Sequence, residues 1–286
     1  MRLLRSVLSL VVLLLLLPAG LQAEEGFARI SLVQGEVQIR GGDDPDWLPA
    51  AINTPLAEGD SVWCPPGARA EIQLRNGARL RLDGPSALDV VEVSDDFQQF
   101  YLAMGRLYLK AGKLEGDRLQ VDVGDAAVVT ADRTRLRIDL AEDGDADIAI
   151  LKGSAYVESL RGRTRVRSGE MLAMNEGGAE LAPLKPPDEW QRWNEQRDRK
   201  QPGKGESSRY LPPELAVYSD DLDSAGEWVT VADYGTVWRP TVNIGASWAP
   251  YRTGRWAWRG GAYVWISFEP WGWGPYHYGR WSHHAR

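Results

Sequence analysis

The sequence predicts an all-β protein: a β-sandwich or roll, then a short helix, then a small Trp-rich β module. Residues 27–174 alternate apolar and polar side chains with a period of two, and turns that contain Gly and Asp interrupt the alternation. No stretch of this region sustains the 3.6-residue period of a helix. The 286-residue chain contains 13 Trp residues, and 11 of them lie after residue 187, so the aromatic side chains belong to a separate module.

The first segment, residues 1–23, has the pattern of a secretory signal peptide. Two arginines precede an apolar run at 7–17, and cleavage is expected near Ala23 and Glu24. The apolar run is shorter than the roughly 20 residues that a helix needs to cross a bilayer. We therefore expect an exported protein, periplasmic or secreted, with no transmembrane span after cleavage. An uncleaved N-terminal anchor is the alternative.

Residues 24–184 are predicted to form the large β domain. The stretch "AEIQLRNGARLRL" is typical of a hairpin, with Asn76-Gly77 as a type I′ turn. Arginines alternate with leucines on these strands, which favours strands with one face in solvent. Cys64 is the only cysteine, so intrachain disulfides and cysteine-built zinc sites are excluded, and a buried, inert thiol is expected.

Residues 185–208 are predicted to form a helix and a linker. Asp188 can cap the helix, and Trp190 and Trp193 lie three residues apart on one helical face. The following "QPGKGESS" is typical of an exposed loop. Its Gly203-Lys204-Gly205 lacks both the spacing and the preceding strand of a phosphate-binding loop.

Residues 209–286 are predicted to form a Trp-, Tyr- and Arg-rich repeat module. The segment 248–256 returns 25 residues later as 273–281, with six of nine positions identical. Each copy is expected to contain a Pro-Tyr turn, a glycine and a new strand that opens on Arg-Trp. Such residues form either an aromatic core or a surface that binds a protein or a cell-wall glycan. The candidate contact residues are Trp248, Tyr251, Arg255, Trp256, Trp273, Tyr276, Arg280 and Trp281.

The charge distribution argues against nucleic acid as a partner. The chain has 33 Lys and Arg against 40 Asp and Glu, a net charge of -7. Residues 24–184 contain 18 basic and 28 acidic side chains, whereas residues 234–286 contain 6 arginines and one glutamate. This polarity predicts that one part docks on the other, or that the module meets an anionic partner.

Neither a metal site nor a cofactor is predicted, and no catalytic motif is present. The alternating carboxylates at 143–147 lack the Gly and Glu that a calcium-binding EF-hand loop requires, so a polar hairpin turn is expected. The acidic cluster at 220–223 is expected to form a helix cap or a turn. All three histidines lie in the last ten residues, so a histidine-dependent enzyme would have to build its site from the tail. Carboxylate pairs of glycosidases have no fixed spacing, and this enzymatic alternative stays open.

Two segments resemble known families. The motifs "GEVQIR", "LAEGDSVWCPPGARAEIQLRNGARLRL", "GRLYLK" and "IAILKGSAYVE" make the region from Phe27 to about Met174 similar to a FecR-type domain. The sequence departs from that family at Asp132-Arg133-Thr134, where a Gly-Thr pair is frequent. The segment that begins "RYLPPELAVYSDD" and ends "GPYHYGRW" resembles a Trp-rich module of unknown function that accompanies FecR-like domains in exported bacterial proteins.

The resemblance implies a periplasmic β domain that recognises other proteins. The named FecR regulators relay a signal to a cytoplasmic sigma factor, which requires a cytoplasmic segment and a membrane span. A signal peptide stands in their place here, so the anti-sigma function is not carried over. We expect a non-enzymatic, exported protein-binding or scaffolding protein of the bacterial cell envelope. The alternatives are a glycan- or peptidoglycan-binding protein that uses the Trp-rich repeat, and an envelope signalling accessory.

Overall fold

The predicted fold class is confirmed by the structure, a computed structural model in which 51% of residues form strands and 13% form helices. The described residues are 28–42, 46–199, 205–242, 244–245, 247–259 and 262–283. The predicted signal peptide (1–23) and its cleavage site near Ala23 and Glu24 lie outside them. Among the described helices, none combines the length and the apolar character needed to cross a membrane.

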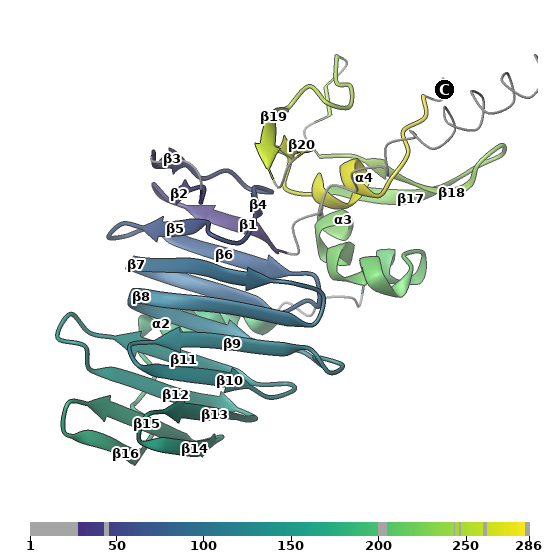
Figure 1. Cartoon of the computed structure of the whole chain (residues 1–286). Coiled ribbons are helices and arrows are strands. Elements are labelled where there is room, and N and C mark those ends of the chain that lie inside the picture. The colour runs from purple at the N-terminus through teal and green to yellow at the C-terminus, as the bar shows by residue number, and fades with distance from the viewer. Residues whose placement is uncertain are drawn as a thin grey trace, which may run out of the picture.

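One 16-stranded sheet folds over itself into the two layers of a sandwich (Figure 1). The first layer contains β4 (Pro55–Leu56), β1 (Ala28–Gln34), β6 (Arg69–Leu74), β11 (Arg135–Leu140), β12 (Ala146–Lys152), β15 (Glu170–Asn175) and β16 (Gly178–Pro183). The second layer contains β3 (Leu48–Pro49), β2 (Gln38–Arg40), β5 (Ser61–Cys64), β9 (Arg118–Val123), β10 (Ala126–Thr130), β13 (Ser154–Ser159) and β14 (Gly162–Arg167). Neighbouring strands are antiparallel except where β8 pairs with β9.

Two long strands, β7 (Arg79–Val93) and β8 (Phe97–Lys110), join the layers. The first half of β7 pairs with β6 and the second half with β5, while β8 pairs with β9 and then with β11. Gly105 lies at the bend of β8 with φ +88°, and a Cβ atom there would come within 2.1 Å of the Pro85 carbonyl oxygen. Only glycine therefore fits where the sheet folds over.

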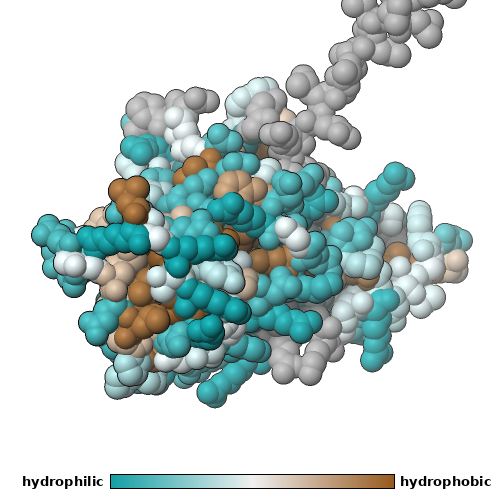
Figure 2. Space-filling view, turned by 60° about the horizontal axis from the view of Figure 1, so that its bottom comes forward, coloured by the Kyte–Doolittle hydropathy of each residue, from teal (hydrophilic) through white to brown (hydrophobic). Residues whose placement is uncertain are grey.

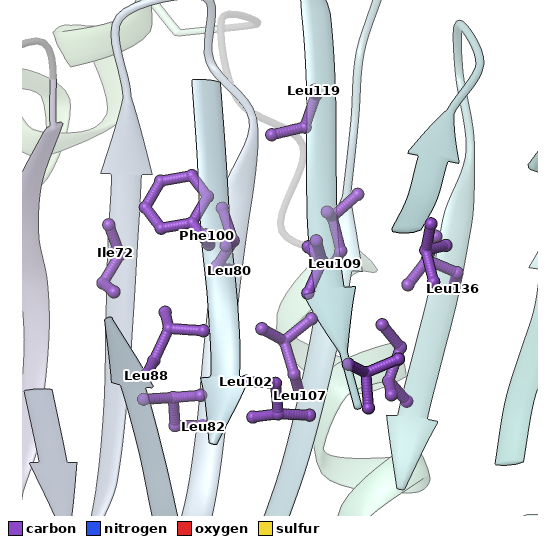
Figure 3. Packing of buried hydrophobic residues seen from close by; sticks show 14 of the residues in the cluster. Ile72, Leu80, Leu82, Leu88, Phe100, Leu102, Leu107, Leu109, Leu119 and Leu136 are labelled. Atoms are coloured by element: carbon purple, nitrogen blue, oxygen red, sulfur yellow. The ribbon is translucent and has the colours of Figure 1, made fainter. Parts of the chain in front are cut away.

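The core between the layers consists mainly of aliphatic side chains. Alternate residues of each strand point inward, as the period-two pattern predicts, and the labelled side chains of Figure 3 form a continuous apolar cluster. Each fully buried leucine or isoleucine contributes roughly 1.5–3 kcal/mol. Cys64 is buried in this core, and burial, reinforced by Asp83, raises the pKa of its thiol to about 12.

The turn between β6 and β7 differs from the predicted type I′ turn. Gly77 has φ +81°, but Asn76 does not have the positive φ that a type I′ turn requires. The Leu74 N–H donates to the Ala78 carbonyl at 2.9 Å, and the Gly77 N–H donates to the Leu74 carbonyl at 3.0 Å. The connection is thus a three-residue loop with glycine in the left-handed position, a common alternative that the Asn-Gly pair does not distinguish.

The outer face of the first layer is not fully exposed, contrary to the expected solvent-facing strands. Helix α2 (Glu189–Arg199) lies across it, and Arg81 is only 1% exposed as a result. The predicted cap is present, because the Asp188 carboxylate accepts the Gln191 N–H at 2.8 Å. Trp190 and Trp193 stack on each other, with ring centroids 5.1 Å apart.

The C-terminal part lies beside the β1 and β4 end of the sandwich (Figure 1). It contains η1 (Ser207–Arg209), η2 (Pro213–Tyr218), α3 (Ser219–Ala225), the hairpin β17 (Gly226–Val231) and β18 (Gly235–Pro240), the hairpin β19 (Gly254–Arg259) and β20 (Ala262–Ser267), and α4 (Trp273–His277).

The two copies of the repeat adopt different structures. The first copy follows the expected pattern, because a turn at Tyr251 (φ +61°) precedes strand β19. The second copy was expected to form another turn and strand, and this expectation is wrong: its Pro-Tyr pair lies in helix α4, and Arg280 and Trp281 follow without forming a strand. The helical turn directs the Tyr276 hydroxyl to the buried Glu269 at 2.7 Å, a contact for which the first copy has no counterpart.

Candidate functional site

The structure divides the eight candidate contact residues between core and surface. Trp273 and Tyr276 are buried, Trp248 and Trp281 are half-buried, and Tyr251, Arg255, Trp256 and Arg280 are exposed. The two copies of the repeat therefore have different surroundings. The first copy presents most of the exposed aromatic surface, and the second supplies most of the buried rings.

Trp271 lies at the centre of the aromatic core of the module. Its ring centroid is 5.1 Å from that of Trp238 and 5.9 Å from that of Tyr276. Glu269, 5% exposed, accepts hydrogen bonds from the Trp248 indole N–H and the Tyr276 hydroxyl, each at 2.7 Å. Burial and the contact with Glu269 raise the pKa of the Tyr276 hydroxyl, which therefore stays a donor. These aromatic residues hold the module together.

One face of the β19–β20 hairpin carries exposed aromatic side chains, which we call the aromatic face: Tyr251, Trp256, Trp258 and Tyr263. The register pairs Trp258 with Tyr263, and their ring centroids are 5.0 Å apart. Trp256 stacks on Tyr251 at 6.0 Å with an interplanar angle of 7°. Trp256, Trp258 and Tyr263 are 57%, 63% and 70% exposed, and Tyr251 is 44% exposed. So much contiguous apolar surface is characteristic of an interaction site.

The buried core supports the aromatic face from behind. Tyr251 packs edge-on against Trp265 at 5.5 Å and against Tyr276 at 4.9 Å. Trp265, the direct cross-strand partner of Trp256, is 5% exposed. The Tyr251 and Trp256 rings therefore extend a packed cluster, which restricts their conformational freedom, whereas Trp258 and Tyr263 contact each other.

Trp258 and Tyr263 are not among the residues that the sequence singles out. The repeat directs attention to Trp256, and Trp258 lies outside the repeated nine residues. Trp258 could have been found from its position in the strand: it lies two residues after Trp256, and residues two apart on a strand share one face. Arg255, which the sequence groups with these residues, points to the opposite face, where its register partner is Ile266.

The opposite end of the molecule has no comparable surface in the view of Figure 2. That view brings the β14–β16 end of the sandwich forward, and the surface is mostly hydrophilic, with hydrophobic side chains in small separate groups. Scattered apolar residues of this kind are usual on soluble proteins.

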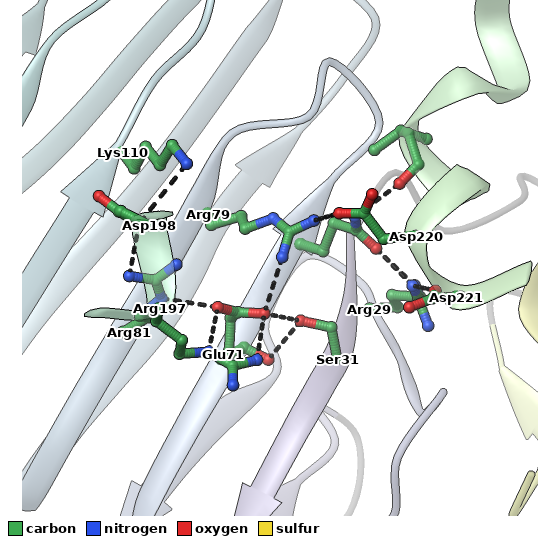
Figure 4. A network of polar contacts seen from close by, with 12 residues as sticks. Arg29, Ser31, Glu71, Arg79, Arg81, Lys110, Arg197, Asp198, Asp220 and Asp221 are labelled. Atoms are coloured by element: carbon green, nitrogen blue, oxygen red, sulfur yellow. Dashed lines mark hydrogen bonds and ion pairs between the residues drawn. The ribbon is translucent and has the colours of Figure 1, made fainter. Parts of the chain in front are cut away.

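A buried polar network lies under α2 and reaches toward the module (Figure 4). Glu71 is 1% exposed and accepts from the Arg81 guanidinium at 2.6 Å, while Arg79 and Arg197 bind it from two other directions. Burial would raise the pKa of Glu71, but the three guanidinium groups hold it well below its usual range. The carboxylate is therefore fixed in its charged form.

Asp198 provides the second carboxylate of this network. It binds the Arg81 guanidinium at 2.8 Å and accepts from the Tyr108 hydroxyl at 2.8 Å. The network is not evident in the sequence, because Glu71 and Arg81 follow the alternation expected of solvent-facing residues. The residue that covers them, Asp198, lies more than 100 positions away.

Arg29 and Asn53 join the sandwich to the module. Arg29 is 3% exposed and binds Asp221 of α3 at 2.5 Å, and its guanidinium also donates to Asn53 and Gln73. The Asn53 amide donates to the carbonyl oxygens of Ser267 and Glu269 at 3.0 and 2.8 Å. The two parts are thus docked through specific buried contacts, but the Arg29–Asp221 bridge reverses the expected charge polarity, because its arginine belongs to the sandwich.

The acidic clusters bind arginines or form turns. Asp143 and Asp145 lie in the turn between β11 and β12, as expected, whereas Asp147 already belongs to β12, where it pairs with Lys185. Asp220 and Asp221 lie in the first turn of α3, and Asp220 approaches Arg79 at 4.0 Å. In the part of the chain that the structure describes, no group of three or more His, Cys, Asp or Glu side chains is arranged to hold a metal ion.

Comparisons with known proteins identify two families in this chain. Residues 60–156 match the family model of the FecR protein, and residues 219–286 match DUF6600, a family of unknown function. Two crystal structures of a "putative anti-sigma factor" from Parabacteroides distasonis ATCC 8503, at 1.65 and 2.50 Å resolution, are similar with 16% identity and a TM-score of 0.39. The similarity covers 44% of this chain and 59% of the neighbour's length. No curated protein matches the chain.

Proposed function

We propose that this chain, which carries a FecR domain and a C-terminal DUF6600 module, is a non-enzymatic protein-binding or scaffolding component of the bacterial cell envelope. The FecR family is regulatory rather than enzymatic, and its members interact with proteins. The predicted signal peptide supports an exported location, periplasmic or secreted. In that setting the protein acts as an accessory of envelope signalling, with its partner bound outside the cytoplasm.

The aromatic face is the observation that carries this proposal. Trp and Tyr are the residues that most often dominate protein interfaces, because they bury a large rigid surface and retain a polar atom. Here four of them are adjacent and exposed, and two of these, Tyr251 and Trp256, pack against the buried Trp265. We infer that Trp258 and Tyr263, the most exposed pair, are the centre of the contact.

Site-specific photo-crosslinking in the envelope tests this function. A benzoylphenylalanine residue at position 263 is expected to give a discrete crosslinked product with a protein. The matched control is position 160, because Leu160 is 93% exposed but lies in the turn between β13 and β14. The product from position 263 should disappear when Trp256 and Trp258 are both changed to Ala. Equal products from both positions, or a product that survives the double substitution, would contradict the proposal.

A glycan is the second candidate ligand, favoured by the exposed, flat indole groups of Trp256 and Trp258, which can stack on sugar rings. Co-sedimentation of the mature protein with purified peptidoglycan tests this function. Retention that the W256A/W258A variant loses, with unchanged thermal unfolding, would support the glycan. Retention that this substitution leaves unchanged would remove glycan binding by the aromatic face.

A further inference from the structure

A second surface feature of the C-terminal module lies away from the aromatic face. It is a groove of about 1120 Å³ where the β17–β18 hairpin, the η2 and α3 helices and the segment after α4 meet. This volume slightly exceeds the roughly 300–1,000 Å³ of typical small-molecule sites. Nothing in the proposed protein-binding role uses this groove.

The walls of the groove are mainly apolar. Val229 and Val237 are direct cross-strand partners on one face of the β17–β18 hairpin, and both line the groove. Leu211 and Leu215 contribute from the helical side, and Ile244 and Pro250 from the connection between the two hairpins. Aliphatic side chains on several elements, most of them half-buried, thus surround the same space, and they favour an apolar ligand.

The segment after α4 adds polar groups to this apolar groove. The Trp281 indole N–H is buried and has no acceptor within the described part of the chain. Arg280, also on the lining, is exposed and has no carboxylate partner among the described residues. Arg239, in contrast, already forms an ion pair with Glu227. An available cation and an unsatisfied donor in adjacent residues are suited to an anionic acceptor.

We propose that this groove binds a single-chain anionic amphiphile, a long aliphatic chain that ends in a carboxylate. The chain lies along the valines and leucines, and the carboxylate binds Arg280 and accepts from the Trp281 indole. The excess of arginine over acidic residues in residues 234–286 complements the charge of the carboxylate.

Two other ligand classes fit the lining less well. A glycan presents many hydroxyl groups around each ring, whereas the aliphatic and aromatic walls of the groove offer few hydrogen-bond partners for them. An apolar peptide would bring backbone N–H and C=O groups along its whole length, and the side chains of Val229 and Val237 on the face of the hairpin offer them no partner. An aliphatic chain has polar atoms only at one end, and the lining matches that distribution.

Binding of oleate to the mature protein, residues 24–286, tests the proposal, with oleyl alcohol as a neutral probe of equal chain length. Quenching of Trp fluorescence by dibromostearate, displaced by oleate, gives the affinity. Oleate is expected to bind at least tenfold more tightly than the alcohol. Arg280→Gln should weaken oleate binding about tenfold and leave the alcohol unchanged, because only the carboxylate contacts Arg280.

Two further variants provide a control for the charge and a test of the apolar wall. Arg252→Gln is the matched control, because Arg252 is exposed, lies outside the groove and, among the described residues, donates only to the Ser247 carbonyl. It should leave both affinities unchanged. The double substitution Val229→Thr and Val237→Thr preserves side-chain shape and strand preference while adding hydroxyl groups. It should weaken both probes.

Several results would overturn the proposal. These are the absence of oleate binding, equal affinity for the acid and the alcohol, or an R280Q variant that binds oleate as tightly as the R252Q variant. Association with phosphatidylglycerol vesicles but not with free oleate would assign the groove to membrane lipid and would also contradict it. None of these results depends on the aromatic face, so the proposed function is tested separately.

Discussion

Glu71 is a single carboxylate on which four structural elements depend. It lies on β6, accepts from arginines of β7 and α2, and also accepts from the Ser31 hydroxyl of β1 at 2.9 Å. Because the site is buried, removal of its charge leaves Arg81 without one of its two compensating carboxylates. Loss of one member of a buried ion pair is far more costly than the pair is stabilising.

We therefore predict that Glu71→Gln lowers the free energy of unfolding by about 3–5 kcal/mol at pH 7. The pKa of Glu71 is lower in the folded than in the unfolded chain, so its contribution is present at neutral pH and is lost as the pH falls below about 4.5. Urea denaturation at pH 7 and pH 3 measures both effects. The wild-type protein should lose more stability between these pH values than E71Q does. The control is Glu158→Gln, whose exposed pair with Arg163 should change stability by less than about 1 kcal/mol.

His277 responds to pH in a different range. Its ring stacks on the Trp273 indole with centroids 4.1 Å apart, and burial, together with the nearby Arg29 charge, lowers its pKa to about 4. The unfolded chain therefore binds a proton between pH 6.5 and 4 that the folded chain does not. We predict that the titration of this residue alone lowers the free energy of unfolding by about 2–3 kcal/mol as the pH falls from 6.5 to 4.

The substitution His277→Phe preserves the stacked ring and removes the titration. Its stability should depend less on pH between 6.5 and 5 than that of the wild-type protein, in denaturation curves measured at half-unit steps. Equal dependence in the two proteins would show that His277 does not titrate as its surroundings imply.

At the scale of elements, the strands could be predicted from the sequence, but the helix that covers their outer face could not. Alternation of Leu and Arg on β7 correctly places Leu80 and Leu82 in the core. The same pattern does not show whether the arginine face of β7 contacts water or another element. The helix that covers this face, α2, lies more than 100 residues further along the chain. The Asn-Gly pair correctly locates a turn, but its type depends on whether one or two residues adopt positive φ. Likewise, the repeat predicts two equal units, yet only one copy opens a strand.

The nonequivalence of the two copies leads to a prediction about corresponding residues. Trp256 and Trp281 occupy the same position of the repeat, but Trp256 is 57% exposed, whereas Trp281 packs on Trp248 and Trp271. We predict that Trp281→Ala lowers the free energy of unfolding by about 2–4 kcal/mol, because it removes rings from the core. Trp256→Ala should change it by less than about 1 kcal/mol. Thermal unfolding of the two variants measures this difference, and equal effects would show that the copies are energetically equivalent.

At the scale of the whole molecule, the sandwich and the module are joined by a polar interface. Arg259 of β19 lies 3.3 Å from Asp60, Arg29 binds Asp221, and the Gln73 amide donates to the Val217 carbonyl. Partial separation of the two parts would cost free energy, because each buried polar group would lose its partner without gaining full access to water. The two parts should therefore unfold together, and the aromatic face and the groove should keep a fixed orientation on the sandwich.

Asn53 allows this coupling to be tested, because it is fully buried and has φ +63°. Glycine adopts this backbone conformation without strain, so Asn53→Gly removes the amide and its contacts while retaining the turn. The carbonyl oxygens of Ser267 and Glu269 then lose their donors, and Arg29 loses an acceptor. We predict a loss of about 3 kcal/mol and, in calorimetry, a single wild-type transition that separates into two.

The matched control for this variant is Glu115→Gly. Glu115 has a similar φ of +55°, but it is exposed, and its ion pair with Lys113 lies in solvent. This substitution should leave the single transition intact and change stability by less than about 1 kcal/mol, because relief of the positive φ offsets the greater freedom of glycine in the unfolded chain. If N53G also unfolds in one transition with unchanged stability, the two parts are held together by contacts other than those of Asn53. In that case the arginine bridges and the Gln73–Val217 hydrogen bond would fix the orientation of the aromatic face.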